Sequence, residues 1–197
     1  DDKVPLSFSS TPRFMYGFGV EFRYKRLSAA VLFKGTGNTD VYHVGVPASN
    51  GALYDEGYIP FYGKQTGNVL SIVKNPANRW ISREYAEKMG LDPSLSENPN
   101  ARFPRMSYGN LENNSQTSSF WKNNAKYLRL SEVNINYSVN VPKTIKNLGI
   151  NSIDLSLVGN NLCVWDKIDI CDPEQALYNG RRYPIPASVT LQAYIKF

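Results

Sequence analysis

Few residues of this sequence have the types and spacing that enzymatic chemistry needs. His43 is the only histidine among the 197 residues, and neither a cysteine nor a serine-nucleophile motif lies beside it. General acid–base and nucleophilic catalysis both require such groups within hydrogen-bond reach of one another. We therefore interpret His43 as a solvated or hydrogen-bonded loop residue, and we predict a non-enzyme without catalytic residues.

Four acidic residues gather in one short segment, namely Asp166, Asp169, Asp172 and Glu174. Paired carboxylates can hydrolyse a glycoside, and clustered carboxylates can bind Ca²⁺. A polar loop is the interpretation that we favour, and we predict neither a metal site nor a cofactor. The pair Gly35 and Gly37 is too short a motif for a phosphate-binding loop.

Cys163 and Cys171 are the only cysteines. Their spacing fits neither a zinc site nor a Cys-x-x-Cys redox motif. Because two cysteines that close a short loop suit an oxidising compartment, we expect a disulfide between them, with two unpaired thiols as the alternative.

The three tryptophans, Trp80, Trp121 and Trp165, suggest sugar stacking, since aromatic faces pack against apolar C–H surfaces. Trp80 is the one candidate that we retain for a substrate contact. The sequence assigns no other substrate-binding residue.

Strands have to position these residues, because alternation with a period of two is the clearest pattern in the chain. Residues 14–24 alternate Phe, Tyr and Val with Gly, Glu and Arg. A regular strand of about 11 residues is long enough to cross a bilayer at a tilt. Similar alternation predicts strands at about 27–34, 127–139, 151–163 and 187–197. We therefore predict an all-β fold, an antiparallel transmembrane β-barrel with a lipid-facing side and a polar interior.

Arg129 is an exception to the alternation of 127–139, because it has the parity of the apolar face. We expect it near a membrane interface or beside a β-bulge, where the register shifts by one residue.

The connections between the strands alternate between short and long. The longest, 35–125, is rich in Gly, Pro, Asn and Ser, with one short helix predicted at 82–89 between the N-cap Ser82 and Gly90. Outer-membrane barrels have long extracellular loops and short periplasmic turns. We therefore interpret 35–125 as an extracellular loop and expect the last strand to end on the periplasmic side, at Phe197.

The composition is compatible with a bacterial outer-membrane location. Aromatic residues make up 13% of the chain, a content that fits aromatic girdles at membrane interfaces and also fits a carbohydrate-binding surface. The net charge of +5 comes from scattered Lys and Arg residues without a basic run, so we predict no nucleic-acid partner. No run of about 18 apolar residues is present, so no transmembrane helix is predicted.

Five strands cannot close a transmembrane barrel, because lipid does not tolerate open sheet edges. We therefore expect the rest of the same barrel to come from sequence outside this chain. The last strand resembles the C-terminal signal that the barrel-assembly machinery recognises, with apolar residues at every second position: Val189, Leu191, Ala193, Ile195 and Phe197.

Several segments together resemble the end of SusC/RagA-type TonB-dependent transporters, in order and at matching spacing. They are 11–17 (TPRFMYG), 33–37 (FKGTG), 98–105 (NPNARFPR), 120–130 (FWKNNAKYLRL), 158–165 (VGNNLCVW), 172–174 (DPE), Gly180 and 183–186 (YPIP). Ala187 departs from the family pattern, which has Arg there. Since Trp121 and Trp165 fall within these motifs, a packing role is expected for both.

The resemblance implies the last five strands of a barrel of about 22 strands. It implies import of glycans or oligopeptides, a SusD-like lipoprotein as lid on the extracellular face, and TonB acting through a plug that these residues do not include. Two alternatives remain open. A siderophore or cobalamin receptor has the same barrel without these motifs, and a secreted β-sandwich binding module shares the alternation.

Overall fold

The computed structural model describes residues 10–42, 69, 71–106, 114, 118–168, 170–178 and 183–197, except for the side chains of 177 and 178. His43, Asp169 and Gly180, which the sequence analysis singled out, lie outside the described residues. The chain divides into two compact units. The sheet unit contains the described residues of Asp1–Val41, Asn123–Leu177 and Arg182–Phe197, and the loop unit contains those of Tyr42–Lys122 and Tyr178–Arg181.

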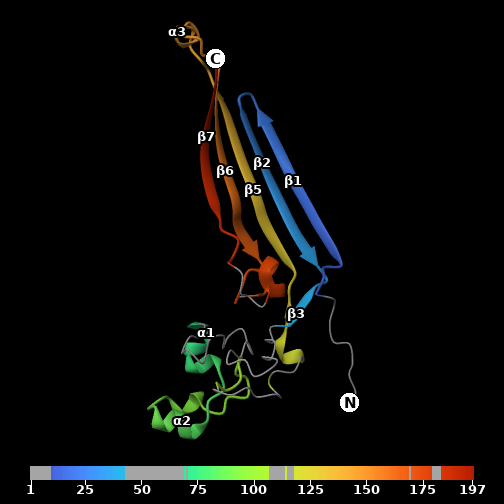
Figure 1. Cartoon of the computed structure of the whole chain (residues 1–197), viewed down its shortest axis with the longest axis vertical. Helices are drawn as coiled ribbons and strands as arrows, with labels where there is room; N and C mark the ends of the chain where they lie inside the picture. Colours follow the sequence, from blue (N-terminus) through green and yellow to red (C-terminus); the bar gives the residue numbers. More distant parts are fainter. Residues whose placement is uncertain are drawn as a thin grey trace, which may run out of the picture. The chain divides into compact units, whose positions relative to one another are not determined.

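The sheet unit is built on five long antiparallel strands in the order β1-β2-β5-β6-β7 (Figure 1). They are β1 (Phe14–Tyr24), β2 (Leu27–Gly37), β5 (Tyr127–Val139), β6 (Ser152–Trp165) and β7 (Ser188–Lys196). The described residues of the sheet unit are therefore mostly antiparallel strand, as the alternation predicted. Two strands are longer than expected, since β2 continues to Gly37 and β6 to Trp165.

Short connections join strands at one end of the sheet. Lys25, with φ of 53°, and Arg26 turn β1 into β2. The turn from β5 to β6 contains the short helix α3 (Lys143–Lys146) and Gly149, whose φ of +91° L-residues rarely adopt. Figure 1 shows α3, the β1–β2 turn and the C-terminus at this same end of the sheet.

A bulge in β5 explains the parity of Arg129. The pairing of β5 with β2 and with β6 shifts register at the residues around Ser131. On β6, the neighbouring Asn161 has a φ of 51°. Because one extra residue moves every preceding side chain to the other face, Arg129 pairs across the ladder with Lys34 and lies on the polar face. The expected position beside a bulge is confirmed.

The other end of the sheet carries a small hydrophobic cluster. Val41, from β3 (Asp40–Tyr42), is buried with Ala125, Ile168 and Ala176. Residue Ala176 belongs to the 3₁₀ helix η7 (Pro173–Tyr178), which follows β6. Strand β3 pairs with β4 (Lys122–Asn124) in a separate two-stranded sheet. The chain therefore gains a folded cap of short elements at the strand ends.

The loop unit has more regular structure than a long irregular loop would. Its described elements are α1 (Ser71–Lys74), η3 (Pro76–Asn78), α2 (Arg83–Lys88), η4 (Pro93–Leu95) and η6 (Ser119–Trp121). Helix α2 occupies the predicted place: the hydroxyl of Ser82 accepts from the N–H of Tyr85 at 3.2 Å, and Gly90 has a φ of 62°. Val73, Phe103 and Trp121 form a small core, which organises the segment without long elements.

None of the helices in the described part of the chain combines the length and the apolar character that crossing a bilayer demands.

Candidate functional site

One face of the five-stranded sheet is continuously apolar and exposed. Register alignment places every second residue of all five strands on it: Phe18, Val20 and Phe22 of β1 stand beside Phe33, Val31 and Ala29 of β2, and the row continues through Val133, Ile135, Leu155, Leu157, Leu191 and Ala193. Val20 is 72% exposed and Leu191 is 75% exposed. Apolar surface of this extent marks a contact with lipid or with another protein.

The opposite face is polar. It presents Glu21, Lys34, Asn134 and Ser156, and the hydroxyl of Ser156 donates to Oδ1 of Asn134 at 3.2 Å. The two faces therefore differ as the lipid-facing and interior sides of a barrel wall differ.

A buried ion-pair cluster lies on this polar face. Nη2 of Arg129 donates to both carboxylate oxygens of Asp172, at 2.8 and 2.7 Å. Nε of Arg129 lies 2.7 Å from Oε1 of Glu174, an ion pair without hydrogen-bond geometry. Lys34 donates to the other oxygen of Glu174 at 3.1 Å. The side chain of Arg129 is only 2% exposed and that of Asp172 is 6% exposed.

The cluster combines two cations with two anions, so its net formal charge is zero. This balance matters because a buried ion without a partner costs several kcal/mol. Asp172 also organises η7 directly, since its Oδ1 accepts from the N–H of Glu174 at 2.9 Å and its carbonyl accepts from the N–H of Gln175 at 2.9 Å. The cluster thus fixes the start of η7 on the polar face of the sheet.

Two of the four acidic residues that the sequence suggested as a polar loop are therefore partners of a strand arginine. Within the described residues, no group of three or more His, Cys, Asp or Glu side chains is arranged to hold a metal ion.

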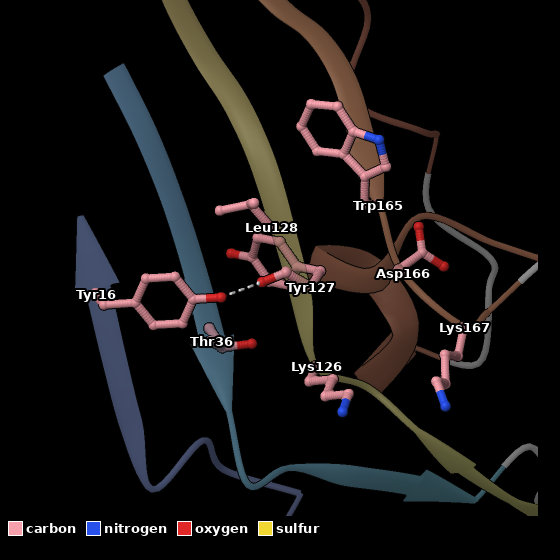
Figure 2. Close-up of a pocket in the computed structure, with 8 residues that line it drawn as sticks. All are labelled: Tyr16, Thr36, Lys126, Tyr127, Leu128, Trp165, Asp166 and Lys167. Atoms are coloured by element: carbon pink, nitrogen blue, oxygen red, sulfur yellow. Dashed lines mark hydrogen bonds between the residues drawn. The ribbon is translucent and has the colours of Figure 1, made fainter. Parts of the chain in front are cut away.

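A cleft of about 430 Å³, which we call the rim cleft, opens at the end of the sheet from which the long connections leave. A row of directly paired residues crosses it on the apolar face: Tyr16, Gly35, Leu128 and Trp165. The ring of Tyr16 lies across Gly35, and its hydroxyl donates to the carbonyl of Tyr127 at 3.1 Å. Figure 2 shows Trp165 at one border of this rim cleft and the side chains of Lys126 and Lys167 at the other.

Trp80 lies in the loop unit and is half-buried. Its backbone N–H donates to the carbonyl of Phe103 at 2.9 Å, beside the bridge that pairs Arg79 with Phe103. No described contact of the Trp80 side chain assigns it a ligand, so a substrate role stays a prediction. Trp121 belongs to the loop-unit core and donates from Nε1 to the carbonyl of Asn114 at 2.8 Å.

Trp165, for which packing was expected, is 52% exposed on the apolar face, with its ring 6.4 Å from that of Phe33. It therefore contributes to the rim cleft, which the sequence analysis did not anticipate.

The alternating residues of the last strand lie together on the apolar face: Val189, Leu191, Ala193 and Ile195 face the same side as their β6 partners Gly159, Leu157, Leu155 and Ile153. Phe197 follows the end of β7 and is 82% exposed. A role of these residues in barrel assembly stays a prediction.

The expected disulfide is absent: both cysteines are described and both are thiols. Cys163 is exposed in β6, where it pairs across the ladder with Leu130 on the apolar face. Cys171 packs instead against the cluster around Val41 and Ile168. Burial, together with the nearby carboxylates of Asp172 and Asp166, raises the pKa of Cys171 to about 11. The sequence suggested a crosslink from proximity along the chain, whereas the strand fixes one thiol on its outer face.

The described part of this chain forms an antiparallel sheet with one apolar and one polar face, and solved structures contain a similar fold. The chain superposes on structures of the RagAB peptide transporter (TM-score 0.60, 16% identity) and of the RagAB peptide importer in the "closed-closed" state (TM-score 0.58, 18% identity) and the "open-open" state (TM-score 0.55, 18% identity). The matches cover 98%, 98% and 96% of this chain but 18% of each matched chain. No protein-family profile and no curated protein sequence matches this chain. At this identity the likeness concerns the fold.

Proposed function

We propose that this chain is part of the membrane-spanning wall of a SusC/RagA-type, TonB-dependent importer in the bacterial outer membrane. The observation that carries the proposal is the sheet with one continuous exposed apolar face and one polar face. Its likeness to the RagAB structures supports the same conclusion. A β-sandwich would cover the apolar face with a second sheet, and no described residues do so.

The edges of the sheet support a larger barrel. Strands β1 and β7 are its edge strands, each paired on one side only among the described strands. Uncovered edges are not tolerated in lipid. We therefore propose that β1 and β7 pair with further strands of the same barrel, about 22 strands in all, and that Val189, Leu191, Ala193, Ile195 and Phe197 form its assembly signal.

The partners and cargo follow from the family resemblance. We propose a SusD-like lipoprotein over the extracellular loops, TonB acting through a plug, and glycans or oligopeptides as cargo. The matched structures are described as a peptide transporter and importer, which favours peptides.

Membrane insertion is tested by one charge placed on either face of β7. Leu191 lies on the apolar face and pairs with Leu157, whereas Thr190 lies on the polar face and pairs with Val158. An arginine near the bilayer midplane on the lipid side costs about 2–4 kcal/mol, a factor of about 30 or more in the folded fraction. In the complete protein, Leu191→Arg should deplete the heat-modifiable folded band in outer-membrane fractions, and Thr190→Arg should leave it intact. Equal behaviour of the two variants would refute a lipid-facing surface.

Import is tested separately in cells that lack the gene. Complementation should restore uptake of labelled oligopeptide or oligosaccharide mixtures only when TonB is active. Deletion of residues 40–100 should weaken co-purification of the lipoprotein lid, whereas an unchanged complex would refute the assignment of the lid contact to this segment.

A further inference from the structure

We propose that the rim cleft binds the phosphorylated headgroup of an outer-leaflet membrane lipid whose acyl chains lie on the apolar face of the sheet. The inference rests on the proposed membrane insertion and adds a ligand to it. The occupant is a lipid because the cleft is continuous with the apolar face, since Tyr16, Leu128 and Trp165 belong to both.

The position of the rim cleft agrees with a membrane interface. It lies at the strand end from which the two long connections leave, the end that we assign to the extracellular side. Tyr and Trp rings concentrate at such interfaces, where one side of the ring is apolar and the other is wet. Tyr16 and Trp165 supply this pair of rings at the two borders of one cross-strand row.

The charges of the rim cleft favour an anion. Lys126 and Lys167 line it, and both side chains are exposed. Within the described residues neither ammonium group has an ion-pair or hydrogen-bond partner, in contrast to Lys34, which pairs with Glu174. Lysines that flank an apolar surface reach lipid phosphates while their methylene stems stay on the apolar side.

Asp166 is the one opposing charge. It lines the rim cleft, and its Oδ1 accepts from the N–H of Ile168 at 2.6 Å, which fixes the loop that carries Lys167. The net formal charge of the three side chains is +1, from two lysines and one aspartate. The carboxylate should therefore weaken the lipid that the lysines attract, so substitutions at the two kinds of residue have opposite expected effects.

The experiment uses the complete protein in detergent and native mass spectrometry with three probes: monophosphoryl lipid A, its enzymatically dephosphorylated form, and inorganic phosphate. The expected result is binding of monophosphoryl lipid A, with much weaker binding of the other two. Each lysine near an anionic headgroup contributes a factor of about five, so the double variant Lys126→Gln/Lys167→Gln should bind it about 25-fold more weakly. Asp166→Asn should bind it severalfold more tightly.

The matched control is Lys74→Gln/Lys88→Gln, which removes the same charge from two exposed lysines of the loop unit. It should leave lipid binding within about twofold, because neither lysine lines the rim cleft. Equal loss in both double variants, or no loss in either, would overturn the proposal. Equal binding of the dephosphorylated lipid would overturn the phosphate contact, and equal binding of inorganic phosphate would overturn the lipid.

The result is distinguishable from failure of the proposed function. If the Leu191→Arg and Thr190→Arg variants differ as expected while the lysine variants retain lipid, only the headgroup site is wrong. The ammonium groups of Lys126 and Lys167 make no described ion pair or hydrogen bond, so their variants should keep the thermal midpoint of the parent protein.

Discussion

Replacing Arg129 by methionine should detach η7 from the sheet while the strands stay paired. Methionine keeps most of the aliphatic volume of arginine, but it removes the positive charge that pairs with Asp172 and that shares Glu174 with Lys34. Lys34 still pairs with Glu174 at 3.1 Å. Asp172, which is 6% exposed, is then left with no cation.

The structure sets the size of this effect. Removing one partner of a buried ion pair costs about 3–5 kcal/mol, because the remaining charge stays desolvated. We expect about 3 kcal/mol, the lower end, since Asp172 retains the N–H of Glu174 as a donor at 2.9 Å. The cost affects the local opening of η7, so amide protection there should fall roughly 150-fold.

Hydrogen exchange of the complete protein in detergent, read by mass spectrometry on peptides that cover 170–178, measures this opening. Arg23→Ala is the matched control, because Arg23 pairs with Glu21 on the same polar face but is 78% exposed, and an exposed pair contributes about 0–1 kcal/mol. Arg129→Met/Asp172→Asn should recover much of the lost protection, since the orphaned charge is gone. A loss below threefold in Arg129→Met, no larger than in Arg23→Ala, would refute the reasoning.

Three further results are expected. Because the thiolate is the reactive form, Cys171, with a pKa of about 11, should react with iodoacetamide at pH 8 about 100-fold more slowly than a thiol of pKa 9. The reaction should accelerate as the pH rises towards 11. A disulfide found by non-reducing mass analysis would contradict the prediction of a slow free thiol. Gly35→Ala should destabilise the protein by about 1–3 kcal/mol, read as a lower thermal midpoint, because its Cβ would meet backbone and ring atoms. Gly17→Ala should leave the midpoint unchanged, because its Cβ would have its nearest neighbour at 3.5 Å. Ser82→Ala should destabilise α2 by about 1 kcal/mol through the lost cap, seen as faster exchange in peptides covering 83–88, and unchanged exchange would exclude the cap.

The strands were predictable because their information is local. Residues 14–24 alternate without interruption, and β1 has the expected bounds, Phe14–Tyr24. A period of two allows only one assignment of faces once one side is apolar. The helix after Ser82 was predictable for the same reason, since a cap and a terminating glycine lie within one short segment.

The ion-pair cluster was not predictable, because its partners are far apart in sequence. Arg129 and Asp172 are separated by 43 residues, and Lys34 and Glu174 by 140. The one local signal was the anomalous parity of Arg129, which indicated a bulge but not a partner. The prediction of a disulfide was wrong for the opposite reason. Closeness in sequence suggested a bond that the orientation of Cys163 in β6 prevents.

The segment after β6 connects the two arrangements that sequence reasoning missed. Its first residues, Asp166 and Lys167, line the rim cleft at the end of β6. A few residues later, Asp172 and Glu174 engage Arg129 on the polar side. The same short segment therefore takes part in both arrangements, and a neutral buried cluster is suited to hold it in place, since it leaves no net charge in the interior. Because only a few residues separate η7 from Lys167, fixing η7 on the polar face also limits where Lys167 can reach.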